Sequence, residues 1–231
     1  GIAIDSPFVQ GASPKVEVDE TDYGYRYYGV RPLGAQGNYV RAYHFVMPFT
    51  QLRPNGNPKP VVNGHFWVPL DDYNVMVYNW AYSYGEEPLS LEESINRGSG
   101  NNFHADIDIS DGFRSLRNKG NNYLIDREVQ RKETFTGIQG VNTQDRAIQE
   151  SMGPIVDRSK EFLGPADMAI VTARRMLSQA INTVSDGGDP PGVEPTYYDI
   201  RAAEQVIPYD LDWREALMSQ LYPTIPAATI K

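Results

Sequence analysis

Apolar and polar residues alternate with the period of two that β-strands have over much of the chain between Pro14 and about Gly85. The alternating segments are rich in aromatic and β-branched residues: KVEVDET, DYGYRYYGVRP, NYVRAYHFVMPF, VNGHFWVPL and YNVMVYNWAYSY. Turn-forming stretches such as PNGNPKP separate some of them. The pattern predicts about five strands, in an antiparallel meander with one broad aromatic face.

Helical patterns follow the strands. Ser90 and Glu93 have the spacing of a capping box, which predicts a short helix beginning there. A second helix is expected to begin at Asp145 and to kink or break near Gly153-Pro154, because proline disrupts a helix interior. Its apolar positions are Ile148, Met152 and Ile155.

The most regular helical pattern runs from about Pro165 to Val184 and is ended by SDGGDPPG. Its apolar stripe consists of Ile170, Ala173, Leu177, Ala180 and Val184. Several strands followed by one long helix indicate an α+β fold. We expect the helix to cross the concave face of a curved antiparallel sheet, the helix-grip or Bet v1-like arrangement. The polar, irregular stretch before Asp145 is expected to form part of a pocket wall.

Composition limits the possible functions. The 231 residues carry a formal net charge of -9, which argues against nucleic acid as a partner because that binding depends on Lys and Arg. No window is apolar enough for a membrane span, and the N-terminus lacks the pattern of a secretory signal, so we expect a cytoplasmic protein with no membrane partner. Without cysteine, a metal could be bound within these residues only by His, Asp, Glu or backbone oxygen.

Asp145 is the first candidate for a functional side chain. An acid in the first turn of a helix usually complements the helix dipole and the amide groups that lack a partner there. The residue pattern alone therefore favours a capping role for Asp145 over a role as a metal ligand.

Several segments resemble one enzyme family. QDRAIQESMGPIVDRSKEFLGPADMAIVTARRML is similar to the C-terminal part of the catalytic domain of Rieske non-haem iron oxygenase α subunits, in the branch that contains phthalate and chlorobenzoate dioxygenases. DYGYRYYGVRP, NYVRAYHFVMPF, GHFWVPLDD, NNYLIDREVQRKETFTGIQGVNTQD and ESMGPIVDRS resemble the same branch. These segments occur in the family's order from about Asp22 to Ile181, so the resemblance is specific.

The resemblance implies a mononuclear Fe(II) held by two histidines and one aspartate, which leaves positions open for O2. It places the aspartate at Asp145. In the family, both histidines lie on a helix that precedes the sheet, and a Rieske domain with a [2Fe-2S] cluster lies further upstream. Neither has a counterpart in this sequence. We therefore expect the two histidine ligands to lie outside this chain and the chain alone to be inactive, with no catalytic residue assigned within it.

None of the three histidines matches a family ligand. His44 and His65 lie in strand-like segments without metal-ligand spacing, and we expect them to be buried or to line a pocket. His104 is close to Asp106 and Asp108 and could form a weak metal site, although a solvated acidic loop is the favoured interpretation.

Arg41 is the candidate substrate-binding residue. The family branch acts on aromatic carboxylates, which an arginine can bind through two parallel hydrogen bonds. Arg41 alternates with Tyr39, Tyr43 and Phe45 and so shares their sheet face. It is a substrate anchor if that face lines the cavity and a surface charge if the face is turned outward. Arg26, in the preceding strand, is a weaker candidate for the same substrate-binding role.

The resemblance also implies the organisation and the reaction. Residues 1–187 would form the catalytic domain without its histidine-bearing helix. For residues 188–231 the residue pattern itself indicates a proline-rich tail with one short amphipathic helix around Trp213 to Leu221. The implied reaction is the hydroxylation or demethylation of an aromatic carboxylate with O2, with electrons from a reductase or ferredoxin, in a homo-oligomer expected to be a trimer. One alternative stays open: a helix-grip protein that binds a hydrophobic ligand without redox chemistry, in which Asp145 only caps its helix.

Overall fold

A computed structural model describes residues 13–54, 60–98, 107–197 and 199–223 of the chain. It contains two compact units. The first comprises Gly1–Trp67, Tyr82–Glu86 and Phe162–Lys231, and the second comprises Val68–Ala81 and Glu87–Glu161. None of the described helices is long and apolar enough to cross a membrane.

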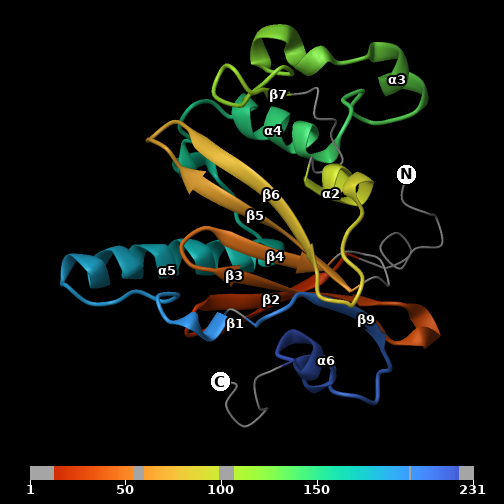
Figure 1. The fold of residues 1–231 in the computed structure, drawn as a ribbon, viewed down its shortest axis with the longest axis vertical. Helices are drawn as coiled ribbons and strands as arrows, with labels where there is room; N and C mark the ends of the chain where they lie inside the picture. Colours follow the sequence, from red (N-terminus) through yellow and green to blue (C-terminus); the bar gives the residue numbers. More distant parts are fainter. Residues whose placement is uncertain (1–12, 55–59, 99–106, 198, 224–231) are drawn as a thin grey trace. The chain divides into compact units, whose positions relative to one another are not determined.

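An antiparallel sheet forms the centre of the first unit (Figure 1). Its strands are β1 (Lys15–Thr21), β2 (Gly24–Pro32), β3 (Asn38–Val46), β4 (Thr50–Pro54), β5 (Val61–Pro69) and β9 (Ala203–Ile207). β1 to β4 pair in succession, β4 pairs with β5, and β9 pairs with β3 next to the end of β4. The strand order continues to β6 (Val75–Ser83), and the residues of both β5 and β6 are divided between the two units.

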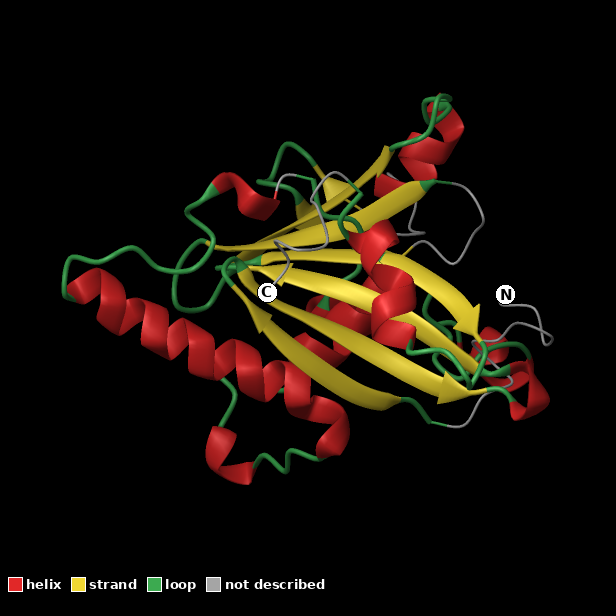
Figure 2. Cartoon of the chain, turned by 90° about the horizontal axis from the view of Figure 1, so that it is seen from below, coloured by secondary structure: helices red, strands yellow, loops and turns green. Residues whose placement is uncertain are grey.

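The predicted α+β class and antiparallel meander are confirmed, and Figure 2 shows the curvature of the strands. The narrower Bet v1-like assignment stays a prediction. The expected count of about five strands was too low because β4 and β9 were not predicted. Each of these two strands is only five residues long, so neither offers a long enough alternating pattern. β9 shows that residues beyond the expected boundary at 187 contribute a strand to the first unit.

The two faces of this sheet carry different helices. Side chains alternate between faces along a strand, so Tyr43 and Phe45 lie opposite to His44 on β3. α5 (Met168–Ser185) packs through Met176 on the face that bears Phe45 and Tyr25. α6 (Trp213–Leu221) lies on the other face, where Tyr222 at its end contacts the His44 ring. We refer to these as the α5 face and the α6 face.

The long helix forms where the sequence predicts it, as the 3-10 helix η5 (Pro165–Asp167) followed by α5. Its predicted stripe is only partly correct. Ala173, Leu177 and Ala180 pack against the core, but Ile170 and Val184 are 47% and 56% exposed. The buried side of the helix is turned toward its two buried residues, Thr172 and Met176, so one edge of the predicted stripe faces away from the sheet.

The second unit is mostly helical and irregular. Its elements are α2 (Leu91–Gly98), a small hairpin of β7 (Ile107–Asp108) and β8 (Arg114–Ser115), the 3-10 helices η3 (Lys119–Leu124) and η4 (Arg158–Lys160), α3 (Arg127–Lys132) and α4 (Val141–Ser151). Two further 3-10 helices, η1 (Gly34–Gln36) and η6 (Pro195–Tyr197), belong to the first unit.

Two predictions for this unit are confirmed. Ser90 and Glu93 form the capping box at α2, since each backbone amide donates to the other side chain at 3.1 Å. α4 ends at Ser151 with Met152 as its C-cap, so the chain leaves the helix at the Gly153-Pro154 pair where a kink or break was predicted.

The predicted start of α4 at Asp145 is wrong. The helix begins at Val141, after Gly140 with a φ of 85°, a left-handed conformation that favours glycine. The buried Thr143 anchors the first turn. The polar Asn142-Thr143 pair resembles a sequence that precedes a helix, but it already lies within α4.

Candidate functional site

Asp145 is the fifth residue of α4, an exposed position past the first turn. It therefore does not lie where an acid complements the first free amides of a helix, and no acid occupies the first turn of α4. The Asp145 side chain forms no hydrogen bond or ion pair with any residue of the described segments. The capping role that the residue pattern favoured is contradicted by this position.

Asp145 shares one side of α4 with exposed apolar residues. Val141, Asp145, Ile148 and Met152 recur at spacings of four, three and four, which places them along the same helix face. The three apolar side chains are 52%, 64% and 53% exposed. A carboxylate without a described partner thus interrupts an exposed apolar stripe.

The described residues do not hold a metal by themselves. Within residues 13–54, 60–98, 107–197 and 199–223, no group of three or more His, Asp or Glu side chains is arranged so that it could hold a metal ion. Asp145 could supply one anionic oxygen, but the other ligands that a mononuclear iron requires are not assembled around it in these segments.

The histidines have other surroundings. His44 is fully buried, with its ring between the Tyr23 hydroxyl and the backbone oxygen of Arg201. Burial lowers its pKa to about 3, so the ring is neutral. His65 is 6% exposed and stacks on Trp67. Both histidines are buried, in agreement with the expectation. His104, together with Asp106, lies outside the described residues.

Arg41 lies on the α5 face and is largely buried. Its Nε donates to Glu204 at 2.8 Å, and its Nη2 donates to the backbone oxygen of Pro54 at 3.1 Å. The side chain is 18% exposed, and its guanidinium carbon lies 5.3 Å from the centre of the Tyr43 ring. Arg41 is therefore neither a plain surface charge nor a cation without a counter-ion, and its role toward a substrate stays a prediction.

The α5 face around Arg41 is aromatic and cationic. Tyr27 and Tyr43 stack with ring centres 4.6 Å apart. Burial raises the pKa of the Tyr43 hydroxyl. Arg41, Arg31 and Arg53 act to lower it and Glu204 acts to raise it, so three positive charges and one negative charge lie near that hydroxyl. Sequence reasoning missed Arg31 and Arg53. Alternation along β2 could have identified Arg31, because it pairs with Tyr39 on this face.

Arg26 is on the opposite face from Arg41. It is paired in register with His44, and its guanidinium contacts Asp19 and Tyr222 under α6. The position of Arg26 therefore does not support a substrate-binding role for it on the α5 face with Arg41.

Comparison with known proteins gives a consistent result. Residues 7–228 match the family described as LigXa C-terminal domain like. The phthalate 4,5-dioxygenase oxygenase subunit of Pseudomonas putida is 35% identical over 208 residues, which cover 88% of this chain and 46% of that protein. The 3-chlorobenzoate-3,4-dioxygenase oxygenase subunit of Comamonas testosteroni is 30% identical over 217 residues, covering 88% and 50%. The chain thus spans about half the length of these curated relatives.

Proposed function

We propose that this chain forms a substrate- and iron-binding part of an enzyme that oxidises an aromatic carboxylate. The chain belongs to the LigXa C-terminal-domain-like family and is a C-terminal portion of a Rieske oxygenase. The reaction class is hydroxylation or demethylation with O2. The names of the two relatives, both dioxygenase oxygenase subunits for aromatic acids, support the choice of substrate class.

The observation that carries this proposal is the environment of Asp145. An exposed carboxylate within an apolar stripe, without a partner among the described residues, has no evident role in stabilising α4. It suits an anionic oxygen ligand whose site is completed by other groups. On this proposal, two histidines from outside the present sequence complete the iron site, and the iron supplies the activation of O2.

Substrate binding is proposed for the α5 face around Arg41. A carboxylate approaching Tyr43 would meet the positive charges of Arg31, Arg41 and Arg53, of which Arg41 is paired with Glu204. An arginine favours a planar carboxylate through its forked donors. The stacked Tyr27 and Tyr43 rings offer an apolar surface to the aromatic part of the substrate.

Electrons would come from a reductase or ferredoxin, as an oxygenase subunit requires a donor, and the assembly is proposed to be a trimer. The large number of exposed apolar side chains in the described residues is compatible with burial against further protein. Light scattering on the purified protein tests the trimer directly.

The proposed activity is tested by O2 uptake with NADH, a reductase of the class and either phthalate or benzoate. We expect a longer oxygenase subunit that contains this sequence to couple O2 uptake to product formation, and the 231-residue chain alone to show none. Robust turnover by the 231-residue chain would contradict the assignment of missing ligands. Tight binding of hydrophobic ligands without O2 uptake by the longer subunit would favour the ligand-binding alternative.

A further inference from the structure

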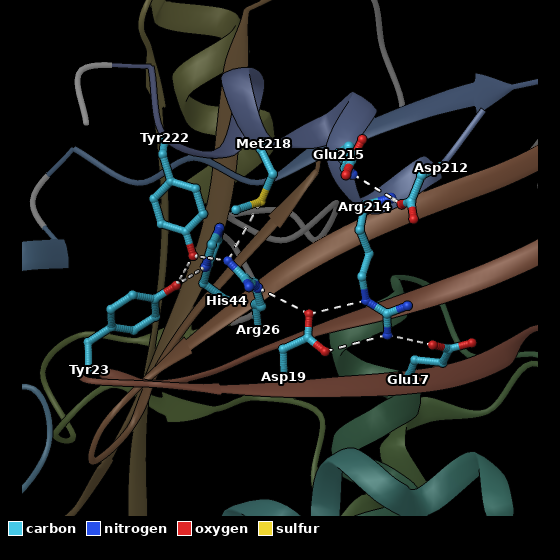
Figure 3. Close-up of polar contacts among 10 residues, drawn as sticks. All are labelled: Glu17, Asp19, Tyr23, Arg26, His44, Asp212, Arg214, Glu215, Met218 and Tyr222. Atoms are coloured by element: carbon cyan, nitrogen blue, oxygen red, sulfur yellow. Dashed lines mark hydrogen bonds and ion pairs between the residues drawn. The ribbon is translucent and has the colours of Figure 1, made fainter. Parts of the chain in front are cut away.

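A buried polar network lies between the sheet and the end of α6 (Figure 3). The Tyr23 hydroxyl is 2.7 Å from Nδ1 of His44 and 2.6 Å from the Tyr222 hydroxyl. Arg26 donates from Nη1 to the Tyr222 hydroxyl at 2.9 Å, and Nε2 of His44 is 3.0 Å from the backbone oxygen of Arg201. The side chains come from β2 and β3, from the turn before β2 and from the residue after α6.

The direction of every hydrogen bond in this network is fixed. The Arg201 carbonyl can only accept, so Nε2 of the neutral His44 ring donates and Nδ1 accepts from Tyr23. Arginine can only donate, so the Tyr222 hydroxyl accepts from Arg26 and donates its own hydrogen to Tyr23. Replacing any one of these side chains by an apolar one leaves a buried neighbour without its partner.

The network joins both ends of one segment to the sheet. Arg201 and Tyr222 bound the segment 201–222, which contains β9 and α6. The two ends are also joined to each other, because the Arg201 amide donates to the Leu221 backbone oxygen at 2.9 Å. Between them, Arg214 at the start of α6 pairs with Glu17 and Asp19 of β1, and it shares the Asp19 carboxylate with Arg26.

This segment carries the counter-ion of Arg41. Glu204 of β9 accepts from Nε of Arg41 and from the Tyr39 hydroxyl, both at 2.8 Å. β9 reaches the sheet only through its ladder with β3 among the described pairings, over five residues. The position of the Glu204 carboxylate therefore depends on how firmly the segment 201–222 is held.

We propose that Tyr23, His44 and Tyr222 form a latch that holds the segment 201–222 on the sheet and thereby keeps Glu204 on Arg41. The three are positioning residues, since they lie on the α6 face and act on Arg41 only through β9. The latch sets the charge and orientation that Arg41 presents on the α5 face. It stands on these contacts alone and does not require that Arg41 binds a substrate.

Tyr222→Phe tests the latch in the 231-residue chain, with Tyr209→Phe as the matched control. Tyr209 lies in the same segment, but this residue is exposed, and among the described residues its hydroxyl donates only to the Gly34 backbone oxygen. Two quantities are measured by NMR: hydrogen exchange of the β9 amides relative to those of the β4–β5 ladder, and the Nε–H signal of Arg41, assigned by its loss in Arg41→Lys.

We expect Tyr222→Phe to accelerate β9 exchange by on the order of ten- to a hundred-fold, because it removes the buried hydrogen bond to the Arg26 charge as well as the one to Tyr23. The β4–β5 amides should change far less, and the Arg41 Nε–H should lose its protection. Tyr209→Phe should leave both unchanged. If Tyr222→Phe accelerated hydrogen exchange equally in all strand ladders and the Arg41 Nε–H signal kept its protection, the latch would be overturned. If Tyr222→Phe does not fold, His44→Gln is measured in the same way, with the same two outcomes.

Discussion

His44 is neutral in the folded protein, and this has a consequence for stability. Its pKa falls from 6.5 to about 3, chiefly because burial disfavours the charged ring, with a smaller contribution from Arg26. Between these pH values the unfolded chain binds a proton that the folded protein does not. The free energy of unfolding therefore rises with pH through this window, and the contribution of His44 is lost as the pH falls below about 6.5.

His44→Gln should remove this dependence. Between about pH 6 and pH 4, the wild-type chain is expected to lose about 1.4 kcal/mol per pH unit more than the variant. Urea unfolding of both proteins at a series of pH values measures the two slopes. Equal slopes would show that His44 is not held neutral by its burial.

The Arg41–Glu204 pair is the second residue-scale prediction. Both side chains are largely buried, at 18% and 16% exposed, so Glu204→Gln should leave Arg41 without its counter-charge. We expect a loss of about 1 to 3 kcal/mol in the free energy of unfolding. Asp111→Asn, which breaks an exposed pair with Arg114, is the control and should have no measurable effect. Equal effects of both substitutions would contradict the structural importance of the pair.

Sequence reasoning identified Arg41 and Asp145 but not their surroundings. The alternation in NYVRAYHF was enough to place Arg41 on a face with Tyr43. Glu204 could not be found in this way, because it is brought to Arg41 by β9, a short strand that lies 163 residues further along the chain. Similarly, nothing in the sequence joins Tyr222 to Tyr23.

At the scale of elements, most segments of seven residues or more with a clear period were predicted, and the five-residue strands β4 and β9 were not. The first strand was placed at its observed bounds, and α6 was found around Trp213 to Leu221. The start of α4 was missed because its first turn contains Asn142 and Thr143, residues that usually precede a helix. Burial of Thr143 overrides that preference, which is a tertiary effect that the sequence pattern does not contain.

The capping box at α2 gives the element-scale prediction. Ser90→Ala removes the acceptor for the Glu93 amide, which should destabilise α2 by about 1 kcal/mol. Because the cap is exposed, we expect the loss to be local. Hydrogen exchange of the α2 amides should accelerate several-fold, while the β1–β2 ladder stays unchanged. An equal change in that ladder would mean that α2 is part of the same cooperative unit as the sheet.

For the whole molecule, the family assignment rests on matches that extend over nearly the full chain, from residue 7 to residue 228. The composition excluded cysteine ligands, and the resemblance supplied iron as the expected metal. The structure adds that Asp145 lies past the first turn of α4, exposed and without a described partner, so helix capping no longer accounts for it. The ligand role of Asp145 remains a proposal.

The most direct test of that proposal uses a longer oxygenase subunit that contains this sequence. Its mononuclear iron content is measured separately from the iron of its Rieske cluster. Asp145→Asn should lose most of the mononuclear iron and keep the cluster, because one of three protein ligands is removed. Asp72→Asn, an exposed acid in the same unit, should retain both. Unchanged mononuclear iron in Asp145→Asn would contradict the assignment of Asp145 as an iron ligand.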